Sequence, residues 1–431
     1  MRTALRRHVP CLLVLVALFF AVAAAQDRHV VRSLEISGLH LTRRWMVERE
    51  LQIAVGDSVT ENTLAAARKR LQNQRVFNDV WLQLDSTGTL SAHVTEAWPL
   101  WPIASFDLSE GQAADVLKKP RDFFKKATVY AGAYDSNLLG SGEQVVAAAQ
   151  FGAAEGAALR FHTRWLAPRW PLAVRAGMEN LRVLDRHASV LDSTRHLRNV
   201  QLDLDVATRE GAPSRVGMKI SYQAVRQEKQ WPAEGHKQRT FRAYPYVILD
   251  RRDLEWYPTR GSWLFVGGDV GVGDVRFVRT QYELRGYFPM TNATRPPVLA
   301  LGGVSATASR STPSWAHYYY GFNTALRGNS GEKSESTDLL VGNAEVRVPL
   351  TRESTYDVPL LGRYGRRWPW GFYGMVFIQR AELKYDGART ERLGWGGGLY
   401  VRVPFVQILE ISAGQNHNRH FQFYAGAGVS F

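Results

Sequence analysis

The sequence predicts a mostly β protein, in which one small α+β domain precedes an antiparallel transmembrane β-barrel of about 16 strands. Three observations predict this fold. From Trp101 onward, segments of about ten residues alternate apolar and polar side chains and are separated by turn residues. Downstream of residue 25 no run of about 18 apolar residues occurs, so no membrane helix is expected. Before the alternating region, residues 28–97 show the pattern of a small mixed domain.

Residues 1–25 have the pattern of a secretory signal peptide. Three arginines precede an apolar run at 11–22, and alanines at 23–25 supply small residues for cleavage. The run is too short for a stable membrane anchor. The only cysteine, Cys11, lies in this segment, so the mature chain is expected to have no disulfide and no cysteine-ligated metal.

The positive charge of the chain does not by itself identify a partner. Removal of residues 1–25 lowers the formal net charge from +14 to +11, because it removes three arginines and no acidic residue. Such an excess is compatible with nucleic acid, but an exported chain rarely meets any. We favour an arginine-rich barrel lumen with loops that face anionic lipid headgroups, and expect no nucleic acid partner.

The small domain is predicted from a strand, two helices and a hairpin. A strand at 31–36 leads to a helix at 42–53, and Thr60 can cap a second helix that carries Leu64, Ala67 and Leu71. A hairpin follows over 77–94. About 70 residues in two helices and three strands are sufficient to fold.

The barrel is predicted over residues 98–431. An even number of strands puts both barrel ends on the periplasmic side, together with the small domain. The strand centres are expected near residues 104, 131, 147, 161, 177, 202, 219, 245, 265, 282, 303, 344, 376, 398, 410 and 426. The polar segment 382–392 then falls outside as a loop, and 351–369 becomes a long connection on the inner side.

Aromatic residues cluster where the predicted strands meet turns, as expected for rings at the two membrane interfaces. Any one of them could instead be a packing residue. The clusters are Trp165 and Trp170, Trp256 and Tyr257, Tyr287 and Phe288, Tyr318 to Tyr320, and Trp368 and Trp370.

Enzymatic function is not expected. Ser, His and Asp occur in no nucleophile-elbow context, no Gly-rich phosphate loop opens a helix, and the 11 histidines show no metal-ligand spacing. The sequence therefore predicts no catalytic residue, no metal site and no cofactor.

The segment 325–350, ALRGNSGEKSESTDLLVGNAEVRVPL, combines an arginine-containing polar loop with an alternating strand. Its Leu-Arg-Gly start and its Asn-x-Glu-x-Arg-x-Pro strand resemble the sixth extracellular loop and the following strand of BamA/TamA-type outer-membrane barrels, the bacterial surface antigen superfamily. Asn329 stands where that family usually has an aromatic residue. Residues 250–261 (DRRDLEWYPTRG) and 134–140 (YDSNLLG) resemble further family motifs.

The small domain resembles a POTRA domain, a polypeptide-transport-associated module. The resemblance rests on Leu34-x-Ile36-x-Gly38, on a Gly56-Asp57 turn, and on Arg75-x-Phe77-x-x-Val80. It implies an exposed sheet edge that pairs with a client strand. A plug or spacer that only folds is the alternative.

The family resemblance implies that the loop arginine folds back into the barrel lumen. We call the residues concerned the lumen latch: Arg327, Gly328, Gln379 and Glu345. The family commonly supplies an acid in a Phe-x-Asp-x-Gly motif, whereas this sequence has Phe377-x-Gln379, which brings a hydrogen-bond acceptor without charge. Glu345 and Glu283 lie on polar faces and are alternative partners, whereas the alternation puts Glu382 on the opposite face of its strand. The other interpretation of Arg327 is an ordinary solvated loop residue.

The last strand, Phe421 to Phe431, alternates and ends on an aromatic residue, like the C-terminal signal that the barrel-assembly machinery recognises. With the first strand, 101–109, it would form a barrel seam that opens laterally. Glycines in the last strand either weaken pairing there or relieve crowding in a tilted barrel. The residues assigned to the seam and the signal are Phe421, Phe423, Gly426, Gly428 and Phe431.

The resemblance implies a protein of the bacterial outer membrane, with its POTRA-like domain in the periplasm, that inserts or translocates polypeptides. The implied partners are client polypeptides or outer-membrane proteins, outer-membrane lipid and lipopolysaccharide, and the barrel-assembly machinery for its own insertion. The alternative is a closed pore, receptor or structural barrel that recruits lipopolysaccharide through its basic loop at Lys118, Lys119, Arg121, Lys125 and Lys126.

Overall fold

The structure is a computed structural model of the 431-residue chain. It describes residues 28–108, 127–166, 172–191, 195–208, 214–227, 237–320, 327, 333–403, 407–416, 418 and 421–427. The predicted signal peptide, the basic loop at 118–126, Gly328, Gly428 and Phe431 lie outside the described residues.

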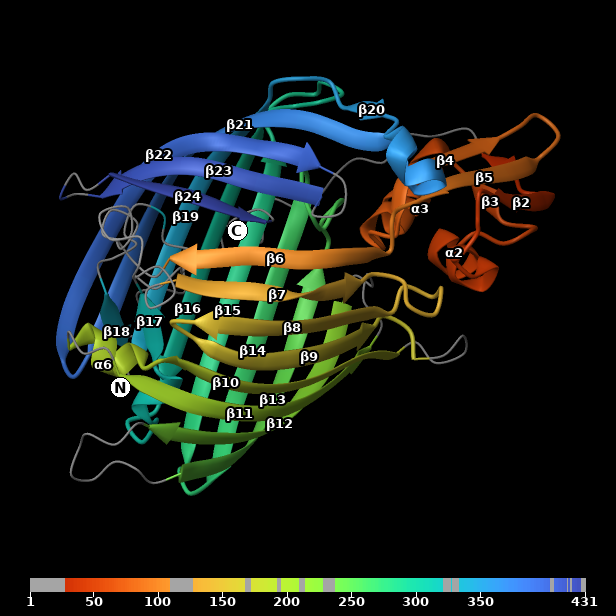
Figure 1. The fold of residues 1–431 in the computed structure, drawn as a ribbon. Coiled ribbons are helices and arrows are strands. Elements are labelled where there is room, and N and C mark those ends of the chain that lie inside the picture. Colours follow the sequence, from red (N-terminus) through yellow and green to blue (C-terminus); the bar gives the residue numbers. More distant parts are fainter. Residues whose placement is uncertain are drawn as a thin grey trace.

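The first part of the chain is an α+β unit, which we call the N-terminal unit (residues 28–97; Figure 1). Its sheet has the order β2-β5-β4, in which β2 runs parallel and β4 antiparallel to β5. A separate pair joins β1 to β3. The elements are β1 (His29–Val30), β2 (Ser33–Ser37), α2 (Arg44–Leu51), β3 (Ser58–Val59), α3 (Glu61–Asn73), β4 (Phe77–Leu84) and β5 (Thr89–Glu96).

The helices of this unit begin and pack as their residues dictate. Thr60 caps α3, because its side chain accepts a hydrogen bond from the backbone N–H of Thr63, whose own hydroxyl accepts from the N–H of Thr60. Met46, Leu51 and Leu71 point from the two helices onto the sheet and are fully buried. This core is sufficient for a compact unit of this size.

All but two of the remaining strands form one barrel, and its order returns to the start because β24 lies next to β6. Every pairing with a described register is antiparallel. The strands are β6 (Leu100–Leu108), β7 (Ala127–Asp135), β8 (Gln144–Gly152), β9 (Glu155–Thr163), β10 (Leu172–Leu184), β11 (His196–Thr208), β12 (Ser214–Gln227), β13 (Lys237–Asp250), β14 (Gly261–Gly273), β15 (Phe277–Pro289), β16 (Val298–Ala308), β19 (Asp338–Pro349), β20 (Ser354–Tyr356), β21 (Trp368–Tyr385), β22 (Ala388–Val403), β23 (Gln407–Asn416) and β24 (Phe421–Ala427).

The predicted antiparallel barrel is confirmed. Each of the 16 expected strand centres falls within one long strand, and the additional member of the sheet, β20, has only three residues and pairs with β21. No helix among the described residues is long and apolar enough to cross a membrane.

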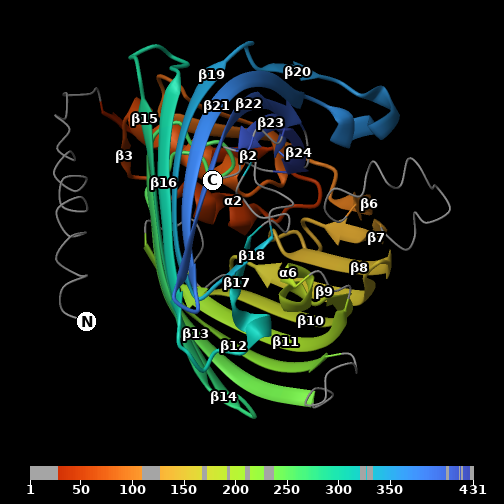
Figure 2. The same cartoon turned by 90° about the vertical axis from the view of Figure 1, so that its left-hand side faces the viewer.

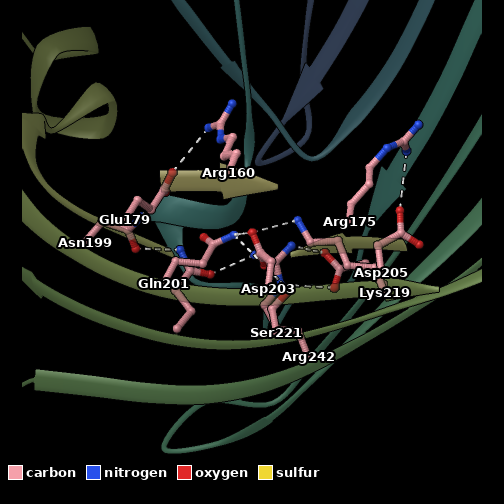
Figure 3. Close-up of polar contacts among 12 residues, drawn as sticks. Arg160, Arg175, Glu179, Asn199, Gln201, Asp203, Asp205, Lys219, Ser221 and Arg242 are labelled. Carbon is pink, nitrogen blue, oxygen red and sulfur yellow. Dashed lines mark hydrogen bonds and ion pairs between the residues drawn. The ribbon is translucent and has the colours of Figure 1, made fainter. Parts of the chain in front are cut away.

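The two faces of the barrel wall differ as the alternation requires. On β11, Leu202 and Leu204 are 51% and 47% exposed on the outer face, whereas Asp205, one residue further along, is 9% exposed on the inner face. The inner face carries a polar network in which Asp203 accepts hydrogen bonds from Gln201 and Ser221 (Figure 3). Polar groups therefore satisfy one another inside, while apolar side chains cover the outside.

The segment 382–392 is not the loop that the sequence predicts. β21 continues to Tyr385 and β22 starts at Ala388, so that most of the segment is strand. Asp386 and Gly387 have φ values of 46° and 80°, as the two central residues of a tight hairpin turn require. Charged residues of this segment form ion pairs with the opposite strand instead, as Glu391 does with Arg380.

Part of the predicted aromatic belt is wrong. Trp165, Trp256, Tyr257 and Tyr287 are all buried, with 2–5% of their surface exposed. Trp256 and Tyr257 belong to a core that also contains Tyr373 and Tyr400. Trp256 and Tyr257 pack inside because the turn between β13 and β14, which carries them, lies against side chains of β21 and β22. The local sequence pattern does not indicate this contact.

The N-terminal unit contacts four turns at one end of the barrel. Asn137, after β7, donates to Thr42 at 2.9 Å, and Trp165, after β9, donates to Glu50 at 2.8 Å. Lys69 lies 3.3 Å from Asp253 in the turn after β13. The fourth contact is made by the 351–369 connection. These turns come from strands spread around the barrel, so the unit is held across its rim rather than at one point.

The long connection 351–369, at the same end of the barrel, contacts β4 of the N-terminal unit. It contains β20 and a 3₁₀ segment, η3 (Pro359–Gly365). Asn78 of β4 donates to the carbonyl oxygens of Tyr364 and Arg366 at 3.0 and 3.1 Å, and Arg367 pairs with Asp79 at 2.7 Å. The connection is long because it reaches the edge of the N-terminal sheet.

Gly140 shows why one of these turns needs glycine. Its φ is +82°, and a Cβ there would lie 2.3 Å from the carbonyl oxygen of Leu41. Its own carbonyl accepts from the N–H of Arg43 at 2.7 Å. The backbone of the turn and that of the N-terminal unit are thus in direct contact.

Short elements lie at the barrel end away from the N-terminal unit (Figure 1). They are α6 (Arg186–Val190), η2 (Ser314–Ala316), β17 (Tyr318–Tyr320) and β18 (Ser334–Ser336). The end-on view places α6, β17 and β18 within the ring of strands (Figure 2). β17 and β18 pair with each other as a separate two-stranded sheet.

Glu96 provides a test of the N-terminal unit. Burial raises the pKa of this carboxyl, but hydrogen bonds from the backbone N–H groups of Leu41, Thr42 and His40 outweigh burial and hold it below its ordinary value. A lowered folded pKa stabilises the fold above the ordinary pKa of 4.5, and the stabilisation is lost as the pH falls through the lowered value.

We therefore expect Glu96→Gln to destabilise the unit at pH 7 by about 1.5–3 kcal/mol, the contribution of hydrogen bonds to a charged group. Hydrogen exchange at the amides of Leu41 and Thr42, compared between variant and wild type at each pH, measures the loss. The protection of the variant and of the wild type should become equal as the pH falls through the lowered pKa of Glu96, because the wild-type carboxyl is then protonated as well. The control is Glu48→Gln, in an exposed pair with Arg44, and equal protection in all three proteins at pH 7 would contradict the assignment.

Candidate functional site

The candidate site is built on the inner faces of three barrel strands. On β19, Glu345 and Arg347 are 1% and 0% exposed, whereas Val348 is 40% exposed on the outer face. On β21, Gln379 is 1% exposed and its neighbour Ile378 is 50% exposed. Glu410 of β23 is 1% exposed. Because side chains alternate along a strand, these polar groups all point into the lumen.

Arg327 meets these groups from the loop that precedes β18. Its Nη2 lies 2.7 Å from Glu345 Oε2, and its Nη1 lies 3.0 Å from Glu410 Oε1. Its backbone N–H donates to Gln379 Oε1 at 2.7 Å. The guanidinium carbon also lies 3.7 Å from the ring centroid of Phe377, in cation–π contact. Arg327 is 4% exposed and is therefore not a solvated loop residue.

Glu345 is shared between two arginines. Its second oxygen, Oε1, accepts from Arg347 Nε at 2.6 Å and from the Tyr400 hydroxyl at 2.9 Å. The guanidinium of Arg347 is enclosed by Tyr257, Tyr287 and Tyr400, whose ring centroids lie 5.4–5.5 Å away. We call the group of Arg327, Glu345, Arg347, Glu410 and Tyr400 the Arg327 cluster.

The charges of the Arg327 cluster balance. Two guanidinium groups face two carboxylates, and all four side chains are almost fully buried. Burial of a single charge would cost several kcal/mol, so each group depends on its partners. Ser412 gives Glu410 a further hydrogen bond at 2.9 Å. An arrangement of this kind fixes Arg327 against β19, β21 and β23.

The structure brings three of the four lumen-latch residues together. Arg327 contacts Glu345 and Gln379 directly, and Gly328 lies outside the described residues. The two other acids considered from sequence lie elsewhere: Glu283 pairs with Arg285, and Glu382 pairs with Arg389.

Glu410 and Arg347 also belong to the cluster, although neither is predicted from the sequence. Glu410 alternates onto the inner face of β23, but only the sheet order β19, β21, β22, β23 and its curvature bring this residue to Arg327. Arg347 belongs to the Asn-x-Glu-x-Arg-x-Pro pattern. Its alternation with Glu345 was the available signal that both side chains share one face.

A second polar group holds the same loop at the outer end of the barrel. Glu335 of β18 lies 2.7 Å from His187 of α6 and 2.5 Å from His317. The Tyr319 hydroxyl donates to the same carboxylate at 3.0 Å. β18 is therefore anchored to α6 in the β10–β11 connection.

The seam residues that are described lie on β24. Phe421 and Phe423 are 61% and 80% exposed, so both rings point away from the barrel interior. Gly426 lies in the same strand, opposite Glu410 in the register with β23. The seam thus adjoins the strand that carries one carboxylate of the Arg327 cluster.

Comparison with solved structures shows the same class of fold. The structure of BamA from Haemophilus ducreyi that lacks POTRA domains 1–3 matches with a TM-score of 0.55 at 12% identity, over 93% of this chain and 84% of that one. CdiB from Acinetobacter baumannii matches with a TM-score of 0.57 at 12% identity, over 92% and 73%. CdiB from Escherichia coli matches with a TM-score of 0.52 at 10% identity, over 95% and 92%. No curated protein matches the chain in sequence.

The fold and the buried loop arginine define a barrel of the BamA and CdiB type. The family model that matches is the Omp85 superfamily domain, over residues 137–431. The chain therefore belongs to the Omp85 superfamily, which confirms the resemblance to BamA-type barrels.

Arg327→Ala tests the Arg327 cluster. The change leaves Glu410 and part of Glu345 buried without a counter-charge, and breaking a buried pair in this way typically costs about 3–5 kcal/mol. We expect the folded band in heat-modifiable gel electrophoresis to disappear at a lower temperature. Proteases should also cut the loop at 321–332 faster.

The matched control is Arg380→Ala, which removes an arginine from an exposed pair with Glu391 on the same barrel. An exposed pair contributes only about 0–1 kcal/mol, so this variant should behave like wild type. Equal effects of the two substitutions would show that the lumenal contacts do not hold the loop.

Proposed function

We propose that this protein is an outer-membrane factor that inserts or translocates other polypeptides, with its N-terminal unit in the periplasm as a single POTRA-like domain. Membership of the Omp85 superfamily supports the proposal at the level of the family. The proposal assigns the chain to transport or assembly rather than to enzymes.

The observation that carries the proposal is the arrangement of the seam. β6 and β24 are the first and the last strand of the barrel and lie next to each other in its order. No turn of the chain joins these two strands, so a barrel that admits a client strand would open between them. Two exposed phenylalanines on β24 offer an apolar surface beside the opening.

The N-terminal unit offers a second edge for an extended client. Its sheet ends in β2 on one side and β4 on the other. Asn78 and Asp79 of β4 are engaged by the 351–369 connection, so β2 is the more accessible edge. Every second residue of β2 is exposed. A client strand that pairs with β2 would extend the three-stranded sheet of the unit.

A closed pore or receptor is the second candidate. The docking of the N-terminal unit on four rim turns favours it, because such contacts hold a fixed arrangement. Depletion of the protein separates the two functions. Loss of particular outer-membrane proteins supports transport, whereas an unchanged outer-membrane proteome with altered permeability would refute it.

A disulfide across the seam tests the mechanism directly. The only cysteine of the chain is Cys11, so introduced thiols have no competitor in a mature protein without the predicted signal peptide. Cysteine at Ile103 of β6 would be combined in turn with cysteine at each of positions 421–425. If the seam must open, the oxidised pair that forms should lose insertion of client proteins into liposomes, and reduction should restore it.

The control joins two barrel strands away from the seam. Val266 and Tyr282 face each other in the register of β14 and β15, and a cysteine pair there fixes the wall without closing the seam. This variant should insert clients at the wild-type rate. Full activity of the oxidised seam variant would exclude lateral opening between β6 and β24.

A further inference from the structure

A cavity of about 290 Å³ lies between the N-terminal unit and the inner face of the barrel. One wall is Arg75, which follows α3 in the N-terminal unit, and the other walls come from β8 to β14 and their turns. The lining residues are Arg75, Gln144, His162, Arg164, Arg175, Arg215, Ile248, Asp250, Arg252, Glu255 and Trp263.

The lining is strongly basic. It contains five arginines and two carboxylates, which leaves an excess of three positive charges among the lining residues of one partly open cavity. Both carboxylates are already engaged: Glu255 lies 3.3 Å from Arg164, and Asp250 lies 2.7 Å from Arg252. Arg175 is paired outside the lining, at 3.4 Å from Asp205 of β11 (Figure 3). Buried like charges at this density repel one another and attract an anion.

Arg75 is held in this cavity at a conformational cost. Its φ is +61°, in the left-handed region that non-glycine residues rarely adopt. Within the described part of the chain, its buried Nε has no hydrogen-bond partner. Burial lowers the pKa of Arg75, and the neighbouring Arg164 lowers it further, against the opposing effect of Glu255. An anion bound beside Arg75 would accept a hydrogen bond from its Nε and offset the repulsion from Arg164.

We propose that this cavity is a binding site for a small phosphate-bearing anion, such as inorganic phosphate or a phosphomonoester. Guanidinium groups match phosphate oxygens in paired hydrogen bonds, and a phosphate dianion would offset most of the excess charge. The volume corresponds to about ten water molecules, which admits a phosphate with a few further atoms. A phospholipid would bind in this basic cavity through its headgroup phosphate.

The site would also join the two parts of the protein. Arg75 comes from the N-terminal unit, whereas Arg164, Arg175 and Arg215 come from the barrel. A bound phosphate would therefore stabilise the docked arrangement. This binding site does not depend on whether the protein transports polypeptides.

The test uses the full mature chain in a phosphate-free, non-ionic detergent. Inorganic phosphate is titrated by calorimetry against a chloride blank at equal ionic strength, and thermal unfolding is followed in the same solutions. We expect saturable binding of about one phosphate per chain and a higher unfolding temperature in phosphate than in chloride. The absence of saturable binding in the millimolar range overturns the proposal.

Two variants and a control locate the site. Arg75→Gln and Arg215→Gln should each weaken phosphate binding about tenfold or more, as expected for loss of a charge-assisted hydrogen bond. Arg160→Gln is the matched control, because Arg160 lies on the same strand as His162 but pairs with Glu179 away from the cavity. Equal affinity of all three variants for phosphate overturns the proposal. If Arg75→Gln does not give a folded band, Arg215→Gln and the wild-type titration still test whether phosphate binds in the cavity.

Competition identifies the source of the phosphate. Glycerol 3-phosphate and short-chain phosphatidic acid are added to protein saturated with inorganic phosphate. Displacement by glycerol 3-phosphate supports a soluble phosphomonoester, and displacement by the lipid alone supports a headgroup. The phosphate site is refuted if phosphate does not bind and an acidic peptide binds equally to the wild type and to the cavity variants.

Discussion

The rest of this structure depends on the pairing of charges inside the barrel. The alternation of each strand puts apolar side chains outside and polar ones inside, so the lumen collects arginines and carboxylates from 16 strands. Buried charges must find partners at short range. Glu345 meets this requirement for two arginines at once, and thereby joins the loop of Arg327 to the wall.

The same requirement explains how the two ends of the barrel differ. At the outer end, Glu335 gathers two histidines and a tyrosine and holds the hairpin of β17 and β18 against α6. At the inner end, five arginines and two acids line one cavity, and Asp205 pairs with Arg175 from outside that lining. We propose that this second arrangement binds a phosphate-bearing anion.

The docking of the N-terminal unit gives this inner end its shape. Four turns from separate parts of the barrel contact helices and strand β4 of the unit, through side chains and through backbone groups such as the carbonyl of Gly140. A unit held this widely would move as one body with the rim. A client polypeptide that pairs with β2 would therefore be held at a fixed position relative to the barrel.

The sequence by itself determined the barrel, the centres of its 16 long strands and the polar and apolar faces of several of them, because a period of two is a local property. It also indicated Arg327 and Glu345, since both lie in one continuous segment. Only the tertiary structure decided that Glu410 completes the cluster, that Trp256 and Tyr257 are buried, and that Arg75 faces four barrel arginines. These contacts join residues from distant strands, and their geometry arises only when the sheet curves into a barrel and the N-terminal unit closes against its rim.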